Sequence, residues 1–128
     1  MSLRHVSTDR APAPGGSYSQ AVVTGDLVHC AGQVGLDPAT GRLADGLAAQ
    51  VEQALRNLEQ VLLAAGSGLD LVTKTTCFLT DIGQFAAFDE VYRRIVPQPF
   101  PARSTFGVAL AGELLVEIEA FAVRRTAG

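Results

Sequence analysis

The stretch Pro99-Phe-Pro-Ala-Arg-Ser-Thr-Phe-Gly-Val108, followed after a short break by Leu114-Leu-Val-Glu-Ile-Glu-Ala120, decides the fold. Both segments are rich in the β-branched and aromatic residues that pack well in sheets, so we expect two strands. Arg103, Glu117 and Glu119 stand inside this otherwise apolar sequence. A guanidinium offers a planar fork of donors that matches a carboxylate, and a strand holds such a fork rigidly. Arg103 is therefore the first candidate for a ligand anchor.

Strand alternation divides each segment between two faces, because successive side chains point to opposite sides of a sheet. The second segment contains an uninterrupted apolar row that we assign to the core, namely Val116, Ile118, Ala120 and Ala122. In the first segment, Arg103, Thr105 and Gly107 share a face. We expect Arg103 and Thr105 to lie with Glu117 and Glu119 on the sheet face that no helix covers. That face is either a solvated surface or a binding surface, and Gly107 favours binding because a strand glycine often marks close approach of a ligand or another backbone.

Two helices are expected in the middle of the chain. Apolar residues recur at helical spacing over residues 47–62, and Gly66 is a natural stop. A second helix should open at Asp81, which forms a capping-box pattern with Gln84. Its expected inward residues, before two prolines end the helix, are Ile82, Phe85, Phe88, Val91, Tyr92 and Ile95.

Three further strands are expected, over residues 18–24, 27–33 and 71–79. The resulting order is two strands, helix, strand, helix and two strands. This order predicts a single α+β domain over residues 1–128, with a mixed sheet and both helices packed on one face. The other face must meet water or another subunit.

Composition limits the function. The chain has 128 residues, of which 48% are hydrophobic and 18% charged, which fits one globular domain with a real core. The formal net charge of −3 provides no basic field for nucleic acid. Residues 1–6 lack the apolar segment of a signal peptide, and no run approaches the ~20 apolar residues of a membrane span. We therefore expect a cytoplasmic protein with no membrane or nucleic-acid partner.

The two cysteines, Cys30 and Cys77, sit in apolar strand-like runs without metal-ligand spacing. This setting predicts buried, reduced thiols in place of a disulfide. His5 and His29 cluster with neither cysteine, and the chain has no glycine loop of the phosphate-cradling kind. We expect no metal site and no organic cofactor.

Six short motifs carry a resemblance that covers nearly the whole chain. They are Gly16-Ser-Tyr-Ser-Gln20, Ala31-Gly-Gln33, Thr40-Gly41, Val72-Thr-Lys-Thr-Thr76, Pro101-Ala-Arg-Ser104 and Val116-Glu-Ile-Glu-Ala120. In this order and spacing the chain resembles the YjgF/YER057c/UK114 family, also called Rid proteins and labelled endoribonuclease L-PSP. The resemblance implies a chorismate-mutase-like α+β fold, a homotrimer with clefts between subunits, and cofactor-independent hydrolysis of enamine and imine intermediates.

The resemblance also implies roles for individual residues. For substrates such as 2-aminoacrylate and 2-iminopropanoate, Arg103 would clamp the carboxylate and Glu117 would hold the attacking water as general base. Tyr18 and Gly32 match positions that line the cleft, and Thr105 matches a position that contacts substrate. The plainer alternatives are an interface salt bridge for Glu117, packing for Tyr18 and strand propensity for Thr105.

Three positions depart from the better-known deaminase pattern. Ala31 stands where serine is frequent, Gly35 replaces a usual proline, and Asp89 stands where asparagine is common. A carboxylate at Asp89, near the cleft, would repel anionic ligands and leaves the substrate preference open. We assign Glu119 to trimer contacts.

Two other functional classes stay open. One is a non-catalytic trimer that binds small carboxylates or acts as a chaperone. The other is an endoribonuclease, which the acidic charge balance and the lack of a histidine pair or a basic, aromatic stripe disfavour. An assay for release of a keto acid from a freshly generated imine would distinguish a catalytic protein from one that only binds.

Overall fold

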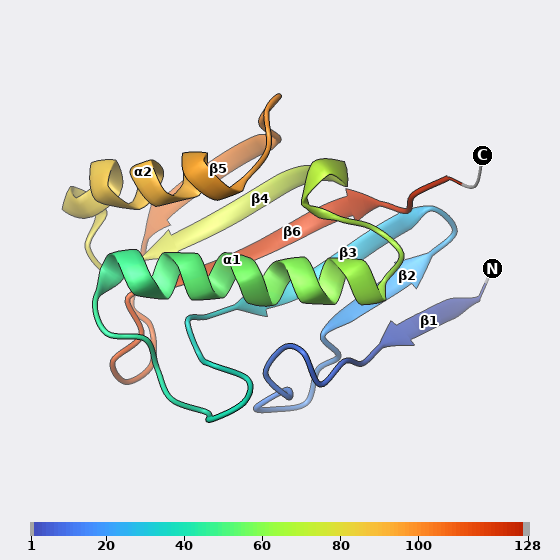
Figure 1. Cartoon of the computed structure of the whole chain (residues 1–128), viewed down its shortest axis with the longest axis horizontal. Coiled ribbons are helices and arrows are strands. Elements are labelled where there is room, and N and C mark those ends of the chain that lie inside the picture. The colour runs from blue at the N-terminus through green and yellow to red at the C-terminus, as the bar shows by residue number, and fades with distance from the viewer. Residues whose placement is uncertain (1, 127–128) are drawn as a thin grey trace.

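The computed structural model describes residues 2–126, in which six strands form one mixed sheet. The strands are β1 (Leu3–Val6), β2 (Ala21–Thr24), β3 (Leu27–Gln33), β4 (Val72–Leu79), β5 (Ala102–Gly107) and β6 (Val116–Val123). Their order across the sheet is β1-β2-β3-β6-β4-β5, and the pairs are antiparallel except for the parallel pair β4–β5. The helices α1 (Leu47–Ala64) and α2 (Phe85–Ile95) lie on the same face of the sheet (Figure 1). The mixed α+β architecture is therefore as predicted.

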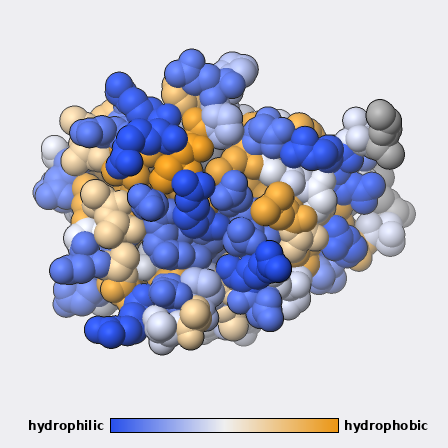
Figure 2. Space-filling model, in the orientation of Figure 1, coloured by the Kyte–Doolittle hydropathy of each residue, from blue (hydrophilic) through white to orange (hydrophobic). Residues whose placement is uncertain are grey.

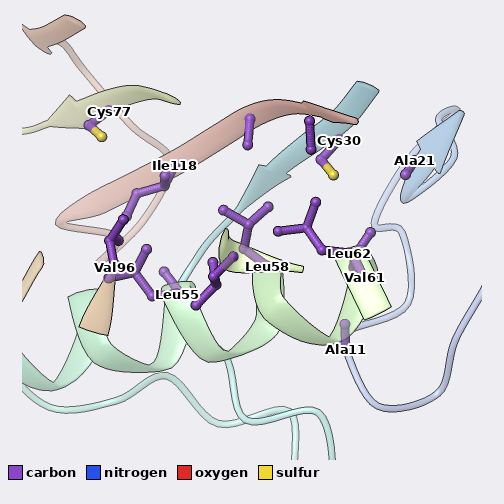
Figure 3. Close-up of a cluster of buried hydrophobic side chains, with 14 of the residues drawn as sticks. Ala11, Ala21, Cys30, Leu55, Leu58, Val61, Leu62, Cys77, Val96 and Ile118 are labelled. Atoms are coloured by element: carbon purple, nitrogen blue, oxygen red, sulfur yellow. The ribbon is translucent and has the colours of Figure 1, made fainter. Parts of the chain in front are cut away.

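The core lies between the helices and the sheet. Figure 3 shows Leu55, Leu58 and Leu62 of α1 directed toward the strands, where Ile118 of β6 lies. The apolar row predicted in β6 is buried throughout. Helix α1 ends where expected, because Gly66 adopts a φ of +82° that other residues rarely adopt. No helix within residues 2–126 is long and apolar enough to cross a membrane.

The N-terminal part of the sheet differs from the prediction. Strand β1 was not expected, because Arg4 and His5 give it no clear alternation; it is held as an edge strand by pairing with β2. Tyr18 was expected inside a strand, but β2 begins only at Ala21 and Tyr18 lies in the preceding loop. The buried side chain of Gln20 fixes that loop by donating to backbone carbonyls and accepting a backbone N–H.

The start of α2 also differs. The Asp81 carboxylate accepts a hydrogen bond from the N–H of Gly83 at 2.9 Å, and so caps a 3₁₀ turn (Ile82–Gln84) that precedes the helix. Ile82 and Phe85 were expected to point inward but are 50% and 38% exposed. The extra turn moves both residues to the margin of the layer. Phe88, Val91 and Tyr92 are buried as predicted.

The face predicted for Arg103 and Thr105 is wrong. In the parallel β4–β5 pair, Arg103 lies opposite Thr75 and Thr105 lies opposite Cys77, and both β4 residues are buried beneath the helix layer. Arg103 and Thr105 thus face the helix layer, whereas Glu117 and Glu119 lie on the uncovered face. Alternation tells which residues of one strand share a face, but only the register between strands tells which face that is.

Candidate active site

Arg103 projects from the edge strand β5 against α2. Its Nη1 donates to Oδ1 of Asp89 at 2.7 Å. Its Cζ lies 4.7 Å from the ring centroid of Tyr92, 5.2 Å from that of Phe85 and 5.6 Å from that of Phe88. A guanidinium within about 6 Å of aromatic faces is held by cation–π attraction. The side chain is therefore fixed in direction while remaining 22% exposed.

Asp89 links two arginines. Its Oδ2 accepts from Nη2 of Arg93, one helical turn further on, at 2.9 Å. The hydrogen bond from Arg103, followed by that from Arg93, lowers the pKa of the Asp89 carboxyl below its ordinary value. Asp89 is thus ionised at neutral pH. The carboxylate that the sequence placed near the cleft is paired with the proposed anchor.

A pocket of about 560 Å³ opens beside this ion-pair chain. Arg103, Arg93 and Asp89 supply its charged wall, and Tyr92 and Phe100 supply apolar surface. Figure 2, which views the helix layer, shows strongly hydrophilic residues next to hydrophobic ones over α2. This volume and mixture of surfaces suit a small organic anion.

A buried polar group supports the pocket from below. The hydroxyls of Tyr92 and Thr75 are 2.8 Å apart, and Sγ of Cys77 lies 3.8 Å from the Thr75 hydroxyl. Burial raises the pKa of the Cys77 thiol to about 11, so this thiol stays protonated. The sequence predicted Tyr92 only as an inward residue. Its spacing of three residues from Asp89, which places both on one helix face, was the signal for a shared site.

Glu117 and Gly32 are in direct contact on the uncovered face. The pairing of β3 with β6 shifts register between Cys30 and Gln33, which is a bulge that brings Gly32 against Glu117. A Cβ built on Gly32 would lie only 2.8 Å from Cδ of Glu117, so a residue with a side chain would displace the carboxylate. Burial, and secondarily the charge of Glu119, raises the pKa of Glu117. A carboxylate with a raised pKa is a better proton acceptor than an ordinary carboxylate.

Helix α1 holds the loop that follows Gly32. The buried Asn57 side chain donates to the carbonyls of Val34 and Leu36 at 2.9 and 2.8 Å. A Cβ on Gly35 would lie 2.7 Å from the Cα of Gln50. The departure at Gly35 therefore allows close packing of this loop on the helix.

Tyr18 lies in an exposed loop, and Gly107 lies against the 3₁₀ turn that precedes α2. Tyr18 is 52% exposed, and its hydroxyl accepts a hydrogen bond from the N–H of Gly15 at 3.1 Å. Gly107 lies close to Ile82, because a Cβ built on Gly107 would be 3.2 Å from the Cβ of Ile82. The space at Gly107 thus serves packing of the 3₁₀ turn on β5.

The Arg103 pocket and the Gly32–Glu117 pair are separate within one chain. Arg103 lies opposite Thr75, which lies opposite Ala120, three residues from Glu117. Two strand spacings and three residue rises put the Cα atoms of Arg103 and Glu117 about 14 Å apart. The two side chains also point to opposite faces of the sheet, so one copy of the chain does not bring them together.

No group of three His, Cys, Asp or Glu side chains in residues 2–126 is placed to hold a metal ion. Cys30 and Cys77 are both free and buried, as predicted. The two candidate groups for chemistry are the guanidinium of Arg103 and the carboxylate of Glu117.

A mixed six-stranded sheet with both helices on one face defines the chain as a two-layer α+β protein. The profile of the family described as Endoribonuclease L-PSP matches residues 8–124, and the chain belongs to this family, the YjgF/Rid family.

Relatives and solved structures agree over nearly the full length. The chain is 42% identical over 121 residues to the 2-iminobutanoate/2-iminopropanoate deaminase of Rattus norvegicus, covering 93% of this chain and 88% of the relative. It is 48% identical over 120 residues to the RutC family protein UK114 of Drosophila melanogaster, covering 92% and 87%.

Among solved structures, RidA from the Antarctic bacterium Psychrobacter sp. is 41% identical with a TM-score of 0.91, covering 94% of this chain and 98% of that one. TdcF of E. coli with bound serine is 35% identical with a TM-score of 0.91, covering 95% and 99%.

Proposed function

We propose that this protein hydrolyses reactive enamine and imine intermediates of the 2-aminoacrylate/2-iminopropanoate type to a 2-oxo acid and ammonia. The observation that carries the proposal is the 42% identity of this chain, over 93% of its length, to a protein named for imine deamination. Arg103 in its pocket and Glu117 against Gly32 supply the two functions that such a reaction needs.

In the proposed reaction, Arg103 binds the substrate carboxylate and directs the adjacent C=N carbon toward a water molecule. Glu117 takes a proton from that water as its oxygen bonds to the carbon, and passes this proton to the nitrogen, giving a neutral carbinolamine. Glu117 then transfers the hydroxyl proton of the carbinolamine to the amine nitrogen, the C–N bond breaks, and the C–O bond becomes the keto group as ammonia leaves. The raised pKa of Glu117 supports this two-way transfer. Tyr18, Gly32 and Thr105 would line the cleft around the substrate.

We propose that the working unit is a homotrimer in which the cleft forms between subunits. Phe106 and Phe121 on the uncovered sheet face are 52% and 51% exposed, which is a surface of the kind that a partner covers. The pocket of Arg103 opens at the edge strand, where the uncovered face of a second copy can reach it. Arg103 of one copy would then meet Glu117 of the next.

We further propose a cofactor-independent reaction in the cytoplasm. The lack of a metal-ligand group within residues 2–126 supports the first point. Two unpaired, buried cysteines suit a reducing compartment and support the second.

The experiment is release of pyruvate and 2-oxobutanoate from imines generated in place by a serine/threonine dehydratase. The protein should accelerate release above the spontaneous rate, with and without EDTA. Arg103→Lys loses the planar fork and should lose both activity and benzoate binding, about tenfold or more. Glu117→Gln should lose turnover while benzoate binding stays within a few-fold.

A wild-type protein that binds benzoate without accelerating release would favour the non-catalytic alternative. Loss of activity with EDTA that zinc restores would contradict the cofactor-independent reaction. The family description as endoribonuclease makes RNA cleavage the third outcome to assay, although the net charge of −3 does not favour an RNA partner.

A further inference from the structure

We propose that Asp89 is a specificity-determining residue, which limits the Arg103 pocket to ligands that carry one carboxylate and an uncharged remainder. This inference rests on the proposed function in one respect, since it takes Arg103 as the anchor for a ligand carboxylate. It concerns the substrate class and not the reaction.

The Asp89 carboxylate is shared between two guanidinium groups. Each oxygen of Asp89 takes one guanidinium, Arg103 at 2.7 Å and Arg93 at 2.9 Å. Arg103 and Asp89 are only 22% and 23% exposed, whereas Arg93 is 64% exposed. Among residues 2–126, Asp89 is the one hydrogen-bonding side chain on the Arg103 guanidinium. A guanidinium has five N–H donors, so most of its donors remain for a ligand.

The charged residues that line the pocket are Arg93, Arg103 and Asp89. Two guanidinium groups and one carboxylate carry a net charge of +1. The hydrogen bonds that lower the pKa of Asp89 keep it ionised, so this charge holds at neutral pH. One ligand carboxylate therefore neutralises the group. A second ligand carboxylate would leave a net negative charge beside a partly buried Asp89.

The rest of the pocket wall is uncharged. Apart from Arg103 and Arg93, no lining residue is cationic, and Tyr92 and Phe100 offer aromatic surface. An apolar or amide-bearing ligand tail meets no unpaired charge there. The pocket thus fits 2-imino acids that derive from neutral amino acids better than those that derive from aspartate or glutamate.

The test compares succinate with succinamate, which have the same length and differ in one carboxylate replaced by an amide. Binding to the intact protein is measured by calorimetry at low ionic strength and about pH 7.5, where both carboxyls of succinate are ionised. Wild type should prefer succinamate. Asp89→Asn should shift the ratio of the two affinities by about tenfold toward succinate, and added salt should shrink the shift.

The matched control is the double variant Asp89→Asn with Arg93→Gln, which restores the net charge of +1. Its ratio of affinities should return to within about threefold of wild type if charge sets the preference. Arg103→Lys should weaken both probes, which assigns the binding to this pocket. Light scattering and thermal unfolding confirm that each variant keeps the assembly of the wild type.

An unchanged ratio in Asp89→Asn would overturn the proposal, and so would a double variant that behaves like the single one. Absence of saturable binding that depends on Arg103 would overturn it as well. Because the probes do not react, a protein that fails the deaminase assay can still pass this test, so the two failures are distinguishable.

Discussion

At the scale of single residues, the two proposed functional side chains are held in different ways. Arg103 is fixed by a carboxylate and three aromatic rings, which is what an anchor with a defined direction needs. Glu117 lies against a glycine at a bulge, half-buried and with a raised pKa. Its position thus depends on the absence of a neighbouring side chain.

That dependence can be tested with Gly32→Ala. The added Cβ would come within 2.8 Å of Cδ of Glu117, so the carboxylate must move. We expect the deaminase rate to fall at least tenfold, because a displacement of about 1 Å in a reacting group costs up to 10²-fold. Carboxylate binding by Arg103 should stay within a few-fold.

The matched control is Gly15→Ala in the exposed loop, where an added Cβ meets nothing within 4 Å. This variant should retain the wild-type rate. Wild-type turnover in Gly32→Ala, with the fold confirmed by circular dichroism, would remove Glu117 from its proposed role.

At the scale of elements, hydrophobic periodicity predicts the core residues correctly where one face of an element is buried. The helical spacing of α1 and the apolar row of β6 predicted the core residues, since both patterns arise from burial on one side. Arg103 was assigned to the wrong face because its strand pairs with β4 in a register that no local pattern contains. The contact between Glu117 and Gly32 depends on a bulge, which is likewise a property of two strands and not of one.

The link between β4 and α2 gives a prediction at this scale. Tyr92→Phe keeps the ring beneath Arg103 but removes the oxygen partner of the buried Thr75 hydroxyl, which is left with the Cys77 thiol, a weak partner. We expect a loss of about 1–3 kcal/mol in the free energy of unfolding, the usual cost of removing the partner of a buried polar group. Binding of succinamate should change little, because the cation–π contact remains.

Urea unfolding at one fixed protomer concentration measures this loss, since an assembly makes stability depend on concentration. Adding Thr75→Val removes both polar partners, so the double variant should lose less than the sum of the single losses. Full additivity would show that the 2.8 Å contact between the hydroxyls contributes no coupling.

At the scale of the whole molecule, the uncovered sheet face carries both a proposed functional residue and exposed aromatic side chains. Glu117 and the exposed Phe106 and Phe121 share it, while Arg103 lies on the opposite face near the edge. A monomer would leave these aromatic side chains in water and the two functional residues apart. Assembly of several copies would cover these side chains and bring the two residues together, which is why we propose a site between subunits.

An experiment that mixes subunits of two variants tests whether each active site takes residues from two copies of the chain. Arg103→Lys and Glu117→Gln are each expected to be nearly inactive, but in a mixed trimer some clefts receive Arg103 from one copy and Glu117 from another. Random assembly of equal amounts should restore about one quarter of the wild-type rate, since each residue is intact with a probability of about one half. Co-refolded subunits, checked by light scattering to be trimeric, are assayed against the same proteins refolded apart and then combined at low temperature. If the co-refolded trimer is no more active than its parents, Arg103 and Glu117 do not act across a subunit boundary.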